Sequence, residues 1–198
     1  MPMTMDDHAW IGESVRRHLQ RFLIHEGAIS GTFPGFYESN IVGMLSRSAI
    51  GLGYDVYLER KCYADGTSRA DLALREPDGG FRFIIEVKVI YDGDDNTLLR
   101  NKLTGGAIYK DLELLSRHTA GNAHRLAFWV VFSPDLDDQV ASPASSQIRL
   151  GDLLLETVVR FPSVRLTQRL TIDCAGLIGA AACEKSCKYA HLLTWSFL

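Results

Sequence analysis

The sequence predicts a mixed α/β (α+β) fold, in which helices flank a central sheet with both parallel and antiparallel strands. Two segments near the N-terminus carry apolar residues at helical spacing. Three strand-like runs follow, and the turns between them contain Asp-Gly, which is typical of β-hairpins. A helical segment then separates the third run from a nearly continuous apolar run, as a crossover to a parallel strand requires.

The two N-terminal helices are predicted at residues 6–26 and 36–50. The first is indicated by an apolar repeat near 3.6 residues, made by Trp10, Ile11, Val15, Leu19, Phe22 and Leu23. Residues 27–35 form a loop rich in glycine with one proline. Gly51 and Gly53 end the second helix, because glycine readily adopts the backbone conformation that closes a helix.

The remaining elements follow in chain order. The antiparallel meander consists of strands at 54–61, 69–76 and 81–90. After it we expect a helix at 98–117, a buried strand at 124–132 that lies parallel to the third meander strand, a helix at 147–160 and a strand at 163–173. The tail from Gly176 has no clear pattern.

Composition places the chain among ordinary globular proteins. It has 198 residues, of which 46% are hydrophobic and 23% charged, and we expect one domain over residues 1–198. No apolar run is long enough for a membrane span, and residues 1–10 lack the features of a secretory signal. Only four cysteines are present, too few for a disulfide scaffold. A cytoplasmic protein is therefore expected.

The second hairpin of the meander brings acidic residues together. If Asp78 and Gly79 occupy the centre of its turn, paired positions add up to 157, and Asp71 lies opposite Glu86. Side chains paired in this way are about 5 Å apart at Cβ. Lys88 follows Glu86 by two residues, so it points to the same face of the sheet.

Two carboxylates at this separation repel each other by roughly 3 kcal/mol at an effective dielectric constant near 20. Three arrangements relieve that repulsion: a divalent cation between them, a proton that they share, or the ammonium of Lys88. Mg²⁺ prefers carboxylate and carbonyl oxygens and keeps several waters. A solvated strand face with an ordinary salt bridge is the alternative, and the matching register of Asp71 with Glu86 argues against it.

Asp71 followed by Glu86-Val87-Lys88 resembles the motif of the PD-(D/E)xK nuclease superfamily, with Ala70 in place of the usual proline. The resemblance covers residues 36–133 and implies a restriction-endonuclease-like core of helix, three strands, helix and strand. The N-terminal helix and the C-terminal extension would pack on that core. The resemblance also implies that Asp71, Glu86 and the Val87 carbonyl hold Mg²⁺ or Mn²⁺, while Lys88 serves the attacking water.

The resemblance suggests further site residues on the two neighbouring helices. Glu38 matches a glutamate that members often add to the metal site from the preceding helix. Lys102 is the candidate substrate contact on the following helix, with Tyr109 and Lys110 as other options there.

Two other clusters have simpler explanations. Asp92, Asp94 and Asp95 lie in a turn that lacks the full calcium-loop pattern. Cys183, Cys187 and His191 have helical spacing and Cys174 could be a fourth zinc ligand, but no C-x2-C pair occurs, so buried thiols are expected.

The sequence therefore predicts a metal-dependent endonuclease, a hydrolase of phosphodiester bonds in nucleic acid, with DNA as the expected substrate. The alternative is a non-catalytic nucleic-acid- or protein-binding module on the same fold. The formal net charge is −3, so nucleic acid has to bind at a local basic surface. Arg60, Lys61, Arg69, Arg100 and Lys102 are the basic residues expected there. A homodimer would supply the two sites needed to cut both strands of a duplex.

Overall fold

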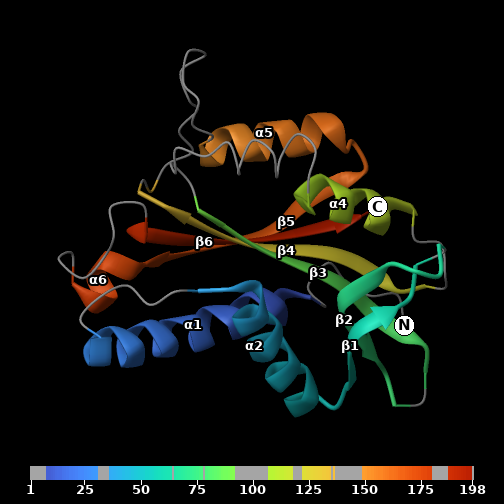
Figure 1. The fold of residues 1–198 in the computed structure, drawn as a ribbon, viewed down its shortest axis with the longest axis horizontal. Helices are drawn as coiled ribbons and strands as arrows, with labels where there is room; N and C mark the ends of the chain where they lie inside the picture. The colour runs from blue at the N-terminus through green and yellow to red at the C-terminus, as the bar shows by residue number, and fades with distance from the viewer. Residues whose placement is uncertain are drawn as a thin grey trace.

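The computed structural model describes residues 8–30, 36–63, 65–77, 79–91, 107–117, 122–134, 136, 149–179 and 187–197. A six-stranded mixed sheet in the order β1-β2-β3-β4-β6-β5 forms its centre, with helices on both faces (Figure 1). The elements are α1 (Ala9–Ser30), α2 (Glu38–Gly51), β1 (Asp55–Lys61), β2 (Arg69–Arg75), β3 (Phe81–Tyr91), α4 (Ala107–Arg117), β4 (His124–Ser133), α5 (Leu150–Arg160), β5 (Val164–Asp173), α6 (Cys174–Ile178) and β6 (Tyr189–Phe197).

The predicted mixed α/β class and the order of elements from α1 to β5 are confirmed. β1, β2 and β3 form the antiparallel meander, and β4 lies parallel to β3, as expected. The predicted helix at 98–117 is seen from Ala107 onward, and its first part lies outside the described residues. Among the helices that the structure describes, none is long and apolar enough to span a membrane.

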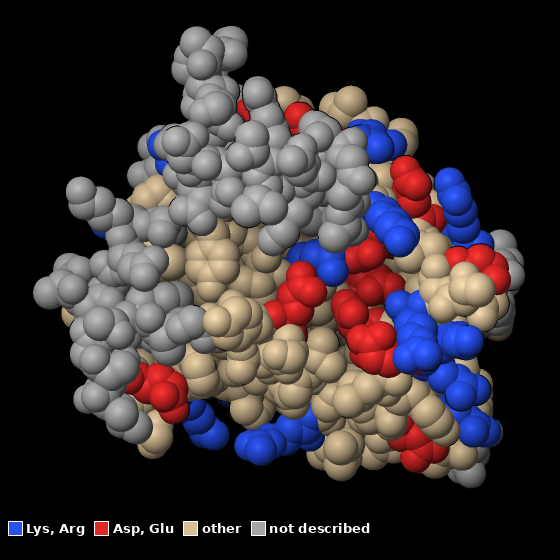
Figure 2. All heavy atoms as spheres, in the orientation of Figure 1, with Lys and Arg blue, Asp and Glu red and all other residues tan. Residues whose placement is uncertain are grey.

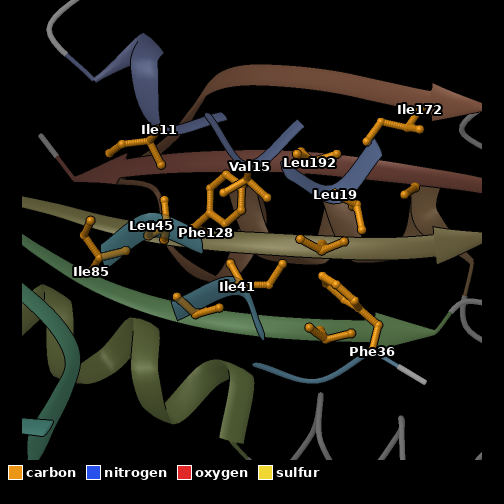
Figure 3. Packing of buried hydrophobic residues seen from close by; sticks show 14 of the residues in the cluster. Ile11, Val15, Leu19, Phe36, Ile41, Leu45, Ile85, Phe128, Ile172 and Leu192 are labelled. Carbon is orange, nitrogen blue, oxygen red and sulfur yellow. The ribbon is translucent and has the colours of Figure 1, made fainter. Parts of the chain in front are cut away.

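Two hydrophobic cores hold the layers together, one on each face of the sheet. α1 and α2 cover one face, where Ile11, Val15 and Leu19 of α1 pack with Ile41 and Leu45 of α2 against the strands (Figure 3). α4 and α5 cover the other face with Leu112, Leu115, Leu150 and Leu153. β3 and β4 lie between these layers, which explains why their sequences are almost continuously apolar.

The register of the second hairpin is confirmed along its strands and wrong at its turn. Leu72 pairs with Ile85 and Leu74 with Phe83, so both pairs add up to 157. Nearer the turn a bulge places Arg75 opposite Phe81. The turn is therefore not the two-residue loop centred on Asp78 and Gly79 that the sequence suggested, because an extra residue is accommodated on one strand.

β2 and β3 separate beyond the Leu72–Ile85 pair. β2 stays with β1, where Lys61 pairs with Arg69, whereas β3 continues along β4 as far as Tyr91. Within the described part of the chain, the half of β3 from Glu86 to Tyr91 therefore has no ladder partner on its β2 side. This divergence opens the sheet at the predicted site.

The C-terminal part extends the same sheet. β6 inserts between β4 and β5 and pairs antiparallel with both. The helical spacing considered for Cys187 and His191 is wrong, because His191 lies in β6, in a short apolar run buried between two strands. Cys174 and Cys187 are buried, as expected, and Cys183 lies outside the described residues.

Candidate active site

Asp71 lies where β2 separates from β3. Its carboxylate accepts a backbone hydrogen bond from β3 that a paired strand would otherwise accept. The backbone N–H of Val87 donates to Asp71 Oδ2 at 2.8 Å. This bond holds the Asp71 carboxylate beside the Glu86–Val87 peptide, close enough for its charge to act on the Glu86 carboxyl. The structure thus brings together the two carboxyls that the hairpin register paired.

Glu86 is almost fully buried, with 3% of its surface exposed. The Tyr63 hydroxyl donates a hydrogen bond to Glu86 Oε1. Burial, and then the charge of Asp71, raise the pKa of Glu86 to about 9, although the Tyr63 hydrogen bond opposes this shift. In the metal-free protein Glu86 therefore keeps its proton at neutral pH, which relieves the repulsion between the two carboxyls.

Lys88 points into the same opening and is held by two acidic residues. Its Nζ is 2.8 Å from Asp111 Oδ2 and 3.4 Å from Glu38 Oε1. Burial acts to lower the pKa of this ammonium, but Asp111 and Glu38 outweigh that effect and raise it. Lys88 is consequently a fixed positive charge with 13% of its side chain exposed.

The structure places the other predicted site residues in different ways. Glu38, in the first turn of α2, forms an ion pair with Lys88, and among the described residues it makes no hydrogen bond or ion pair with Asp71 or Glu86. Tyr109 is buried in the core beneath α4 and α5, and its hydroxyl donates to Glu156 at 2.8 Å. Lys110 is exposed, and Lys102 lies outside the described residues.

Sequence reasoning missed two residues of this site, Tyr63 and Asp111. Tyr63 follows β1 in a short connection, where no periodicity indicates which way a side chain points. Asp111 did carry a usable signal, because it precedes the buried Leu115 by four residues and so falls on the apolar face of its helix. A charged residue on such a face usually has a buried partner, which here is Lys88.

The donor set suits a hard cation only in part. Among the described residues, no group of three or more His, Cys, Asp or Glu side chains is arranged to hold a metal ion. Mg²⁺ is commonly bound through one or two carboxylates, with waters and substrate oxygens completing its shell. Asp71 and Glu86 supply two carboxyls. The Val87 carbonyl points to the same side as its N–H, toward Asp71, because a strand residue presents both groups on one side.

Comparison with known proteins gives no relative from which a role could be transferred. No family model matches the chain, and no curated protein or solved structure matches it either.

Basic side chains surround the acidic residues on the surface of the protein. Figure 2 shows Asp and Glu side chains gathered in a hollow of the surface, with Lys and Arg on its rim. Arg60, Lys61 and Arg69, on β1 and β2, are exposed, and they belong to the basic set that the sequence analysis placed near the site. Arg100 and Lys102 lie outside the described residues. Such a rim attracts a polyanion toward an otherwise acidic centre.

Replacing Tyr63 with phenylalanine should raise the pKa of Glu86 further in the metal-free protein. The hydroxyl of Tyr63 stabilises the ionised carboxylate, and phenylalanine keeps the ring but removes that donor. Titration of the Glu86 side-chain carbon by NMR would measure the shift. A pKa that stays the same or falls would show that this hydrogen bond does not tune the carboxyl.

Proposed function

We propose that this protein is a Mg²⁺- or Mn²⁺-dependent endonuclease that hydrolyses phosphodiester bonds in nucleic acid, with DNA as the preferred substrate. The observation that carries the proposal is the Asp71 carboxylate bonded to the Val87 N–H, beside the buried Glu86 and the charged Lys88, where the sheet opens. The order α2-β1-β2-β3-α4-β4 supports the proposal of a restriction-endonuclease-like core.

In this proposal Asp71, Glu86 and the Val87 carbonyl hold the cation. A bound divalent cation polarises a phosphate oxygen and lowers the pKa of a coordinated water. Glu86 has to release its proton to become a ligand, so the cation takes over the relief of repulsion that the proton provides in the metal-free protein.

Lys88 acts as a hydrogen-bond donor and a positive charge. Because Asp111 and Glu38 keep its ammonium protonated, it is suited to orient the attacking water or to stabilise charge on the phosphate, not to accept a proton. Asp111 and Glu38 are then positioning residues for Lys88.

The second candidate is a non-catalytic binding module, and one observation favours it. The network is complete without a cation: Glu86 is bonded to Tyr63 and Lys88 is paired with Asp111 and Glu38. A side-chain network of this kind also serves a purely structural purpose.

Incubation with supercoiled plasmid, circular single-stranded DNA and RNA separates the two candidates. Each substrate is tested with Mg²⁺, Mn²⁺ or EDTA, and closed circles report internal cleavage only. We expect DNA to be nicked or linearised with either cation and to remain intact in EDTA. Substrates that bind the protein but stay uncut in both cations would support the binding module instead.

A further inference from the structure

A polar cleft lies between α1 and α2, and its lining on α2 begins with Ser39, one residue after Glu38. It has a volume of about 490 Å³, within the range of ligand-binding pockets. Its lining consists of His18, Arg21 and Phe22 from α1 and Ser39, Asn40, Gly43, Met44 and Arg47 from α2. These described lining residues include three basic side chains and no carboxylate, so the cleft is suited to an anionic ligand.

The two arginines of the cleft are available to such a ligand. Arg21 and Arg47 are exposed, and among the described residues neither has a carboxylate within ion-pair distance. Arg16 on the same helix differs, because it is paired with Glu13 at 2.8 Å. A guanidinium without a carboxylate partner matches the geometry of a phosphate group through two parallel hydrogen bonds.

The cleft also offers apolar surface for a flat ring. Phe22 and Met44 are half-buried, and the ring of Phe22 packs against Phe36 with centroids 5.4 Å apart. Surfaces that combine positive charge with an aromatic side chain bind single-stranded nucleic acid, because unpaired bases stack on the ring. A duplex keeps the faces of its bases stacked inside, so it gains little from Phe22.

The cleft and the acidic site share helix α2. Ser39 and Asn40 follow Glu38, whose carboxylate is 3.4 Å from Lys88 Nζ. Arg47 is nine residues further along α2, which corresponds to about 13 Å along the helix axis.

We propose that the cleft between α1 and α2 binds a single strand of nucleic acid, with phosphates on Arg21 and Arg47 and a base against Phe22. This site deepens the proposed function by naming the form of the substrate, and only the cleavage of the bound strand rests on that function. Binding is measured in EDTA, in which the proposed metal-dependent cleavage does not occur.

Fluorescence anisotropy with labelled oligothymidylate in EDTA tests the site. The double variant Arg21→Ala/Arg47→Ala should bind about tenfold more weakly. The slope of log Kd against log salt should fall by about 1.4, because each phosphate contact on a single strand contributes about 0.7. Arg165→Ala is the matched control, since Arg165 is exposed on the edge strand β5 and does not line the cleft, and the affinity and slope of this variant should equal those of the wild type.

A glycine in the cleft allows a second, independent variant. A Cβ added at Gly43 meets no heavy atom within 4 Å, so Gly43→Glu introduces a carboxylate without a clash. It should weaken oligothymidylate binding by repelling the phosphates. Gly51→Glu makes the same change on the same helix, outside the cleft and also without a clash, and should leave binding unchanged.

Three results would overturn the proposal. The first is wild-type affinity and salt slope in the double variant. The second is equally tight binding of a hairpin duplex with the same loss in the variants, which would make the cleft a duplex-binding surface. The third is displacement of oligothymidylate by polyglutamate as effectively as by unlabelled oligothymidylate, which would show attraction of any polyanion. Because all measurements are made in EDTA, a failure of the nuclease proposal leaves each of these readouts interpretable.

Discussion

Replacing Lys88 with alanine should lower the single-turnover rate of DNA cleavage by about 100-fold or more, the usual effect of losing a positioned electrostatic group. The affinity for Mn²⁺ should stay within a few-fold of the wild type or become tighter, because a positive charge leaves the neighbourhood of the cation. Isothermal titration with Mn²⁺ beside single-turnover cleavage measures both effects. Lys88→Arg keeps the charge but not the compact ammonium, and it should rescue little activity.

The ion pair with Asp111 provides the control for this prediction. Lys88→Ala leaves Asp111, whose side chain is only 17% exposed, without its partner at 2.8 Å. That should cost about 2 kcal/mol of stability, less than for a fully buried pair because both groups retain some solvent contact. The double variant Lys88→Ala/Asp111→Asn should recover this stability and remain inactive. Recovery of cleavage together with stability would assign Lys88 a structural role.

Glu86→Gln should stabilise the metal-free protein by about 3 kcal/mol at pH 7. The folded protein raises the pKa of Glu86 from 4.5 to about 9 through burial and the charge of Asp71. Below pH 4.5 both the folded and the unfolded states hold the proton, so this group does not alter stability. Between pH 4.5 and 9 only the unfolded state has released it, so stability falls by about 1.4 kcal/mol per pH unit.

Glutamine cannot ionise, yet it keeps an acceptor for Tyr63 and a donor for Asp71, so Glu86→Gln removes this pH-dependent loss. Urea denaturation in EDTA over a pH series should show the variant and the wild type converging near pH 4.5 and separating toward neutral pH. Addition of Mg²⁺ should stabilise the wild type more than Glu86→Gln. A variant that is less stable than the wild type at pH 7 in EDTA would mean that Glu86 is a charged partner in a structural salt bridge.

The spacing of apolar residues predicted most of the helices and strands. The register of the second hairpin predicted the site. Leu72, Leu74, Phe83 and Ile85 alternate in sequence, and that alternation fixes their pairing because a slip by one residue would turn them away from the core. The same register names Asp71 and Glu86 as the next pair. In the structure the ladder ends at Leu72 and Ile85, and Asp71 instead accepts the N–H of Val87.

Other features depended on contacts that the sequence does not encode locally. β6 was not predicted, because its short apolar run follows an irregular tail and a buried strand of that length resembles a buried helix. Tyr63 and Asp111 join the site only because the β1–β2 connection and α4 lie against side chains of β3. β2 and β3 diverge and open the site because β2 remains paired with β1, whereas β3 remains paired with β4.

Single-turnover cleavage of labelled DNA by Asp71→Asn, in Mg²⁺ and in EDTA, tests the central claim most directly. Asp55→Asn is the matched control, because Asp55 is an exposed aspartate on the neighbouring strand β1. We predict metal-dependent cleavage by the wild type and Asp55→Asn, and none by Asp71→Asn despite an intact fold. Cleavage by Asp71→Asn at the wild-type rate, or cleavage that persists in EDTA, would contradict a metal-dependent nuclease site at Asp71 and Glu86.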